Sequence, residues 1–177
     1  MLNEIGVRYN TDKSSIAHNF LDFYEQLLYG KQINTVLEIG IYEGASLKMW
    51  AEYYHKAQIY GFDIDPSVLV NGGNIKSYLC DQSDSKQLYD TIMENGIDPD
   101  LVIEDGSHLW SHQIITFNTI FPLLKTGAIY IVEDLHTSYM PDYCDQNLRP
   151  IDYFSEMDKF TILRNSDMSI TGAIVKE

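Results

Sequence analysis

The hydrophobic positions of the chain gather in short runs rich in β-branched residues, and each run is followed by turn residues. Segments of helix length, with mixed polar and apolar residues, separate the runs, as is typical of α/β proteins. The runs do not alternate strictly between apolar and polar residues, which predicts parallel strands covered on both faces. The predicted strands are residues 35–39, 59–62, 76–79, 101–103 and 128–132.

Three segments between these strands have the length and composition of helices. They comprise residues 45–57, 84–94 and 108–124, and Gly96 and Gly127 stand where C-terminal caps are expected. Strands that alternate with such helices predict a doubly wound sheet.

Two further apolar runs, residues 160–163 and 170–175, lie near the end of the chain. The stretch between them is too short to hold a crossover helix, so the two strands are expected to pair antiparallel. The expected fold class is α/β: a doubly wound, mostly parallel, seven-stranded Rossmann-like sheet with a terminal antiparallel strand pair.

The length of 177 residues predicts a single domain over residues 1–177. Residues 1–33 are expected to form an N-terminal helical segment, in which Ser14 or Ser15 caps a helix. The apolar stripe of this helix would consist of Ile16, Phe20, Phe23, Leu27 and Leu28. Residues 136–158 contain two prolines and no clear period, so they are expected to form a long loop on the substrate side.

Composition and charge exclude several function classes. Apolar residues make up 45% of the chain and charged residues 21%, as in a globular protein with a packed core. The net charge of −14 leaves no basic surface for nucleic acid or for an anionic membrane, so neither is expected as a partner. Only two cysteines are present, and no segment has the ~20 apolar residues of a membrane span or the pattern of a signal peptide. We expect a cytoplasmic protein.

The turn after the first strand reads Glu38-Ile39-Gly40-Ile41-Tyr42-Glu43-Gly44, with its glycines four residues apart. It lacks the Gly-x-Gly-x-x-Gly spacing of dinucleotide sites, and Glu43 disfavours a phosphate near the following helix. Gly40 and Gly44 permit close approach of a ligand to the backbone, and Glu38 can face a positive group. This pattern suits a nucleoside ligand with a cationic or zwitterionic tail; an ordinary strand-to-helix turn is the alternative.

Polar residues at the ends of the next two strands predict the rest of a nucleoside site. Asp65 followed by Pro66 is typical of a helix cap, which leaves Asp63 at the strand end as the acid for two ribose hydroxyls. Asp81 and Gln82 follow the third strand and are expected at the adenine edge. Ligands of doubly wound sheets bind at the carboxyl ends of the strands, so the three strand ends would form one cofactor site.

The fourth and fifth strands end in pairs of acids, Glu104-Asp105 and Glu133-Asp134. Because like charges in one small volume need neutralisation by protons, cations or a metal, a hard divalent ion such as Mg²⁺ is expected here. Glu104 and Asp105 point to opposite faces of their strand, and Gly106 frees the backbone after Asp105, so Asp105 is preferred. The predicted metal ligands are therefore Asp105, Glu133 and Asp134. A solvated acidic rim is the alternative.

His108 follows Asp105 by three positions, at the start of a predicted helix and within reach of a group bound to the ion. We expect it to act as a general base. His112 lies one turn later and raises the alternative of a metal pair with His108, but no glutamate stands between them as in zincins. His112, His18 and His55 are therefore assigned surface or structural roles.

These features resemble the class I S-adenosylmethionine-dependent methyltransferase fold over nearly the whole chain. Four segments resemble a narrower group, the metal-dependent sugar O-methyltransferases of macrolide and rhamnosyl-antibiotic tailoring. The segments are Thr11-Asp12-Lys13, Glu38-Ile39-Gly40, Asp105-Gly106-Ser107-His108 and Glu133-Asp134-Leu135-His136-Thr137-Ser138-Tyr139. In that family the aspartate of the Asp-Gly-Ser-His segment and the Glu-Asp pair bind magnesium, and the histidine is the general base. The resemblance implies the same roles for Asp105, Glu133, Asp134 and His108.

The resemblance implies an enzyme that transfers a methyl group from S-adenosyl-L-methionine to a sugar hydroxyl of a glycoside, polysaccharide or glycosylated natural product. Mg²⁺ would acidify that hydroxyl, and Asp105 and His108 would be the catalytic residues. Two alternatives remain: a catechol or phenol O-methyltransferase with the same metal chemistry, and a non-catalytic metabolite-binding module whose acids hold a structural ion. The expected partner is a small-molecule or glycan substrate, and assembly as a homo-oligomer is left open.

Overall fold

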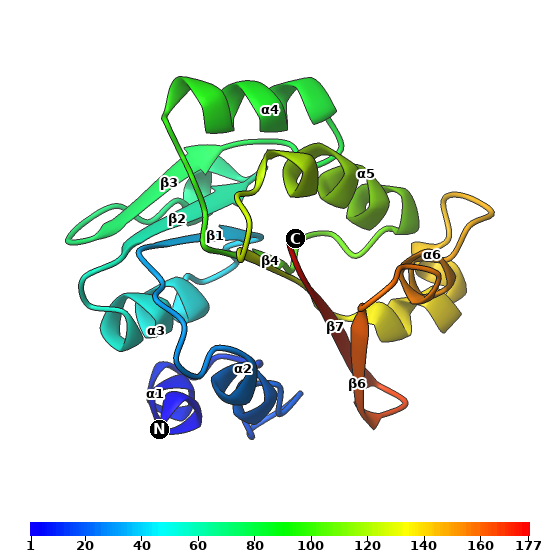
Figure 1. The fold of residues 1–177 in the computed structure, drawn as a ribbon, viewed down its shortest axis with the longest axis horizontal. Coiled ribbons are helices and arrows are strands. Elements are labelled where there is room, and N and C mark those ends of the chain that lie inside the picture. The colour runs from blue at the N-terminus through cyan, green and yellow to red at the C-terminus, as the bar shows by residue number, and fades with distance from the viewer.

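Seven strands form one mixed sheet in the computed structural model, which describes residues 1–177 (Figure 1). The strand order is β3-β2-β1-β4-β5-β7-β6. The strands are β1 (Thr35–Ile39), β2 (Gln58–Asp63), β3 (Ile75–Leu79), β4 (Leu101–Glu104), β5 (Ile129–Val132), β6 (Thr161–Ser166) and β7 (Ser169–Val175).

The pairing of these strands confirms the predicted fold class. Strands β1 to β5 pair in parallel, and β7 runs antiparallel between β5 and β6. The strand order reverses between β1 and β4, which lie side by side at the centre of the sheet. In such sheets, the carboxyl ends of the strands at this reversal mark the place where ligands bind.

Helices cover both faces of the sheet (Figure 1). The first three pack with one core, and the last three pack with the other. The helices are α1 (Leu2–Tyr9), α2 (Leu21–Leu27), α3 (Ala45–Tyr53), α4 (Ser85–Glu94), α5 (Trp110–Ile120) and α6 (Pro150–Ser155). The three helices predicted between the strands are confirmed as α3, α4 and α5, with ends shifted by a few residues.

Alternate residues of each central strand point into the two separate cores. In β4, Leu101 and Ile103 face the core that contains α1 to α3, whereas Val102 faces the core that contains α4 to α6. All three side chains are fully buried. Burial on both faces explains why these strands lack a strict alternation of apolar and polar residues.

The N-terminal segment differs from the single helix that the sequence predicted. Asn10 adopts a left-handed conformation (φ 58°) and ends α1, and turns follow until α2 begins at Leu21. Ser14 does not cap a helix; its hydroxyl donates a hydrogen bond to the carbonyl oxygen of Thr11 at 2.7 Å. Ile16, which was expected on the apolar stripe, is 56% exposed. The predicted helix from residue 14 is therefore wrong in its first turns, because residues 14–20 form turns and the helix begins only at Leu21.

The stretch of residues 136–158 is also more ordered than a long loop. It contains the 3₁₀ turns Leu135–Tyr139 and Pro141–Tyr143 and the helix α6, whose Ile151 and Phe154 are buried. A helix of six residues is too short to give a readable hydrophobic period, so the sequence pattern did not indicate it. No helix in the structure has the length and apolar character needed to cross a membrane.

Candidate active site

A cavity of about 840 Å³ lies at the carboxyl ends of the central parallel strands. Its walls come from the loops after β1, β2, β3 and β4 and from the segment of residues 10–13 between α1 and α2. Of the predicted cofactor residues, Gly40, Asp63, Asp81 and Gln82 line this cavity. Its volume is within the range of sites for small organic ligands and cofactors.

The glycine turn after β1 forms the floor of the cavity. Gly40 has a φ of +93°, and a Cβ atom at this position would lie 2.1 Å from the carbonyl oxygen of Asp105. Only glycine is compatible with this approach of two backbones. Gly44 does not line the cavity but has a φ of +71° directly before α3, where a Cβ atom would lie 2.7 Å from Val70 Cγ2. Both glycines thus have conformations that shape the turn, and their predicted role in letting a ligand approach the backbone stays a prediction.

Asp63 stands at the end of β2, at the cavity wall. Its Oδ2 atom accepts a hydrogen bond from the N–H of Ile41 at 2.7 Å, and Oδ1 accepts one from the N–H of Asp65 at 2.9 Å. These bonds hold the carboxylate beside the glycine turn, and each oxygen keeps a further lone pair for a ligand hydroxyl. Asp65 caps the 3₁₀ turn that begins at Pro66, as predicted.

The residues after β3 are tied to their own loop and to the protein interior. Asp81 Oδ1 accepts hydrogen bonds from the N–H and the hydroxyl of Ser83, and these bonds lower the pKa of Asp81. Gln82 is buried, and its Nε2 atom donates a hydrogen bond to Glu104 Oε1 at 2.8 Å. Its Oε1 atom accepts a hydrogen bond from the N–H of Ser107 at 2.6 Å. The amide of Gln82 is thus engaged inside the protein rather than directed only at a ligand.

Lys13 lies among the acids for which the sequence predicted neutralisation by a divalent ion. Its side chain is 1% exposed, and its Nζ atom lies 3.2 Å from both Glu38 Oε1 and Glu133 Oε2. The same atom forms an ion pair with Asp105. Glu38 was expected to face a positive group of the ligand; instead it pairs with Lys13 and does not line the cavity.

Burial and mutual charge shift the pKa values in this cluster. Burial alone would lower the pKa of Lys13, but the carboxylates of Asp105, Glu133 and Glu38 outweigh it and raise the pKa well above the usual value. Burial raises the pKa of Glu38 to about 7 and that of Glu133 well above its usual value, although Lys13 opposes both shifts. The raised pKa values of the two glutamates show that one internal ammonium does not fully offset the cost of burying these carboxylates.

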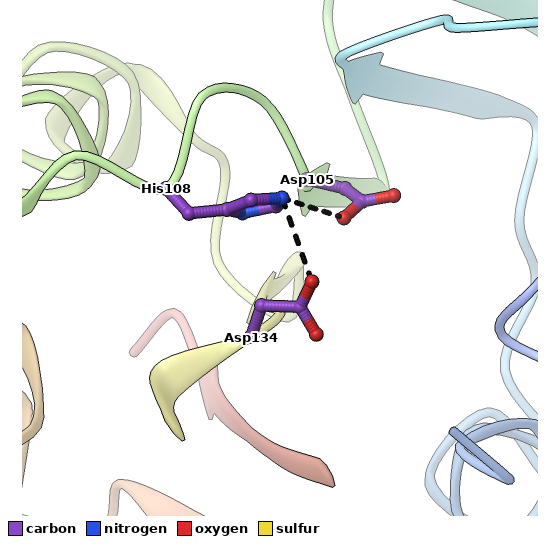
Figure 2. Close-up of side chains that lie close together, drawn as sticks. All are labelled: Asp105, His108 and Asp134. Carbon is purple, nitrogen blue, oxygen red and sulfur yellow. Dashed lines mark ion pairs between the residues drawn. The ribbon is translucent and has the colours of Figure 1, made fainter. Parts of the chain in front are cut away.

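Three side chains from two strand ends, Asp105, His108 and Asp134, point toward one another, as Figure 2 shows. Asp105 and His108 line the cavity, and Asp134 lies beside them. The Nε2 atom of His108 lies 3.4 Å from Asp134 Oδ2 and 3.9 Å from Asp105 Oδ1. One ligand atom from each of the three residues lies within 4.8 Å of the others. Each residue is partly exposed, so a bound ion or an acceptor can reach the group. Asp105 and Asp134 follow adjacent parallel strands, which explains their approach.

The backbone at this group is strained. Both His108 (φ 59°) and Asp134 (φ 53°) have left-handed backbone conformations. Such conformations cost about 1–3 kcal/mol for a residue with a side chain, and they concentrate at functional sites. The turns that direct these two side chains toward each other are therefore held against a local energetic cost.

Other residues near the group were not identified from the sequence. The Nδ1 atoms of His18 and His136 lie 3.9 Å and 3.7 Å from Asp134 Oδ1. The sequence predicts a surface or structural role for His18. Its proximity to Asp134 depends on the turns before α2, which no sequence period indicates. His112 hydrogen-bonds Ser107 Oγ at 2.8 Å, as a structural histidine would, and it is not part of the cluster of possible metal ligands.

The structure therefore brings together part of the predicted metal site. Asp105 and Asp134 lie in one group with His108. The third expected ligand, Glu133, is fully buried beside Lys13 and is not in that group. Its Oε1 atom and the Oδ1 atom of Asp134 have no hydrogen-bond partner, although both are buried. Hard carboxylate oxygens without partners match the ligand chemistry of Mg²⁺.

Several curated proteins are similar to the chain in sequence. An 8-demethyl-8-alpha-L-rhamnosyl tetracenomycin-C 2'-O-methyltransferase from Streptomyces olivaceus is 37% identical over 149 residues, which cover 78% of this chain and 39% of the relative. The mycinamicin VI 2''-O-methyltransferase from Micromonospora griseorubida is 35% identical over 154 residues, with coverage of 82% and 38%. The chain spans about two fifths of the length of these relatives. No family model matches the chain.

Several solved structures have the same fold. The MycE methyltransferase of the mycinamycin biosynthetic pathway, in complex with Mg, SAH and mycinamycin VI, has a TM-score of 0.73 and 35% identity, and the match covers 80% of this chain and 39% of that one. A putative caffeoyl-CoA O-methyltransferase from Staphylococcus aureus shares the fold at 15% identity, with a TM-score of 0.65 over 88% of this chain and 82% of that one. The chain thus has the fold of the class I S-adenosylmethionine-dependent methyltransferases and, among them, resembles the sugar O-methyltransferases of antibiotic tailoring.

Proposed function

We propose that the chain is the catalytic domain of an S-adenosylmethionine- and Mg²⁺-dependent O-methyltransferase that acts on a sugar hydroxyl. The observation that carries this proposal is the group of Asp105, His108 and Asp134 at the edge of a cavity large enough for the cofactor. A candidate base beside two candidate metal ligands is the arrangement that activation of a hydroxyl requires.

The cavity supports the cofactor part of the proposal. Gly40 lets a ligand approach the backbone after β1, and Asp63 presents a carboxylate to ribose hydroxyls at the end of β2. Asp81 and Gln82 line the part of the cavity that would receive the adenine. Glu38, which is buried next to Lys13, and Gly44, which shapes the turn before α3, would act behind the cavity wall. MycE, which was solved with SAH, places its cofactor product in the same fold.

The donor set supports the metal part. Asp105 and Asp134 would hold the ion, and Glu133 would contribute its unpartnered Oε1 atom. Oxygen ligands from two or three carboxylates, with positions left for water and substrate, are the usual environment of Mg²⁺. MycE was also solved with Mg. Glu133 is 2% exposed, unlike the residues of a solvated acidic rim.

Together the bound groups supply a methyl donor and a Lewis acid that makes a coordinated hydroxyl more acidic. The chain's own residues do the rest. His108 is placed so that its Nε2 atom can accept the hydroxyl proton, while Asp134 at 3.4 Å stabilises the imidazolium that results. The loops after β1 and β4 hold donor and acceptor in register.

The acceptor is assigned from the relatives and from the shape of the site. The named relatives methylate hydroxyls of rhamnosyl and other sugar groups on antibiotics. The ring of Tyr143 lies 6.2 Å from that of His108, on the stretch after Asp134, where a sugar or an aromatic acceptor could stack. A catechol or phenol acceptor remains the second candidate, since the metal chemistry is shared. The negative net charge and the two free cysteines support an acceptor that is not nucleic acid and a cytoplasmic location.

The test is transfer of a labelled methyl group from S-adenosylmethionine to a panel of rhamnosides, other deoxy-sugar glycosides and catechols. We expect transfer to a sugar, loss of transfer with a chelator, and recovery when Mg²⁺ is added back. Transfer only to catechols would favour the second candidate. Binding of S-adenosylhomocysteine without transfer to any acceptor would contradict the enzymatic proposal and favour a metabolite-binding module.

A further inference from the structure

Lys13 is the one lysine whose side chain is fully buried, and it is far in sequence from the residues that surround it. It lies between α1 and α2, in the segment that forms one wall of the cavity. Its three acidic partners come from the ends of three different strands: Glu38 of β1, Asp105 after β4 and Glu133 after β5. One side chain of the N-terminal segment thus joins the strand ends that carry the proposed chemistry.

Lys13 bonds one of the two carboxylate oxygens of Asp105, and it does the same with Glu133. On Asp105, Oδ2 bonds Lys13, while Oδ1 faces His108 Nε2 at 3.9 Å. On Glu133, Oε2 bonds Lys13 at 3.2 Å, while Oε1 has no partner at all. In each case the ammonium holds one oxygen and leaves the other available. A carboxylate fixed by one oxygen has fewer rotamers in which the second oxygen can point away.

We propose that Lys13 is a positioning residue for the divalent ion: by binding one oxygen each of Asp105 and Glu133, it directs their other oxygens toward the ion. The inference rests on the proposed function, because it assumes that these acids hold Mg²⁺. It goes beyond that function by giving a role to a residue to which the proposed reaction assigns none.

Electrostatics alone predicts the opposite effect of Lys13 on the ion. A positive charge next to a cation site repels the cation, so removal of the ammonium would tighten binding of Mg²⁺. Orientation predicts that removal loosens binding, because Asp105 and Glu133 lose the partner that sets their direction. The sign of the change in affinity therefore separates the two effects.

The experiment measures Mg²⁺ affinity by isothermal titration calorimetry on the wild type and on Lys13→Met, which keeps the length of the side chain but removes the charge. We expect Lys13→Met to bind Mg²⁺ at least tenfold more weakly. The matched control is Lys125→Met, because Lys125 also joins two carboxylates, Asp98 at 3.0 Å and Asp100 at 2.8 Å, but at the opposite end of β4. This control is expected to keep the wild-type affinity. Circular dichroism checks that each variant is folded.

Unchanged or tighter binding of Mg²⁺ by folded Lys13→Met would overturn the inference. If that variant does not fold, Lys13→Arg decides: its charge is retained, but its planar guanidinium cannot take the place of a compact ammonium among three oxygens, so weaker binding is expected. Wild-type affinity in Lys13→Arg would overturn the inference. Failure of the wild type itself to bind Mg²⁺ would contradict the proposed function, whereas binding that Lys13→Met retains contradicts only the role of Lys13.

Discussion

The side chain of Gln82 accepts a hydrogen bond from the backbone N–H of Ser107 at 2.6 Å and so joins the end of β3 to the loop after β4. The same amide donates to the buried Glu104 at 2.8 Å. A Cβ atom on Gly106 would lie 1.9 Å from Gln82 Oε1, so the glycine leaves room for this contact. Gln82, which lines the cavity, therefore holds the loop that carries His108 in place.

Replacement of Gln82 by Ala should destabilise the protein and disturb catalysis. The variant removes the Gln82 donor from the buried Glu104, which keeps only the N–H of Gly106 at 3.4 Å, and it removes the acceptor of the Ser107 N–H. A buried polar group left unsatisfied costs about 1–3 kcal/mol. Urea unfolding should show this loss, and turnover should fall because the loop of His108 is less well placed. Gln32→Ala, at an exposed position, should change the free energy of unfolding by less than ~0.5 kcal/mol. Equal stability of the two variants would argue against this role.

Replacement of His108 by Ala should lower kcat by roughly 10²–10⁴-fold if His108 is the general base. Affinity for S-adenosylhomocysteine should stay close to that of the wild type, because the imidazole acts on the acceptor. Steady-state kinetics and calorimetry measure the two effects separately. His55→Ala, which changes an exposed histidine, serves as the control. Wild-type turnover in His108→Ala would remove His108 from the mechanism.

Replacement of Asp63 by Ala should weaken binding of S-adenosylhomocysteine by at least about tenfold, because a hydrogen bond to a charged group contributes roughly 1.5–3 kcal/mol. The comparison variant is Asp84→Ala, which removes the cap of α4. Loss of a cap costs about 1 kcal/mol of stability, but Asp84 does not line the cavity, so affinity should not change. Calorimetry that finds equal affinities in both variants would contradict the ribose role of Asp63.

Replacement of Gly40 by Ala should be far more damaging than replacement of Gly127 by Ala. The two glycines have similar φ values of +93° and +89°, so the cost of backbone strain is matched. At Gly127 nothing lies within 4 Å of the added Cβ atom, whereas at Gly40 the Asp105 carbonyl oxygen lies 2.1 Å away. Thermal unfolding of the two variants therefore isolates the steric contribution. Similar melting temperatures would show that the loop after β4 can move aside.

The two cysteines should differ in reactivity toward a disulfide reagent such as DTNB. Burial raises the pKa of Cys80 to about 11, and because the thiolate is the reactive form, Cys80 should stay unreactive in the folded protein at pH 8. Cys144 is exposed and free, so it should react. The native protein should therefore release one equivalent, the unfolded protein two, and native Cys144→Ser none. Rapid reaction of native Cys144→Ser would show that Cys80 is accessible.

The sheet could be predicted from the sequence because each central strand is buried on both faces and gives a continuous apolar run. The antiparallel strands β6 and β7 followed from the short stretch between them. The residues at the strand ends could be located in the same way, since chain order and strand order place Asp63, Asp105 and Asp134 at one edge of the sheet.

The N-terminal part of the site could not be predicted in this way. Lys13 and His18 belong to turns without a hydrophobic period, so their approach to the acids depends on contacts between distant parts of the chain. The sequence indicated that close carboxylates need a cation, but it did not show that a lysine supplies part of the charge. The direction of Gln82 into the protein likewise depends on the absence of a side chain at Gly106.

The main-chain contact between Gly40 and Asp105 also limits how the protein can move. The N–H of Asp105 donates a hydrogen bond to the carbonyl oxygen of Ile39 at 2.9 Å. Backbone contacts therefore hold the glycine turn after β1 against the loop after β4 that carries Asp105. A hinge motion that separated these two loops would have to break hydrogen bonds between β1 and β4 at the centre of the sheet. In the proposed enzyme, the distance between methyl donor and acceptor would thus be fixed by the folded backbone. Ligands would enter and leave past the surface turns.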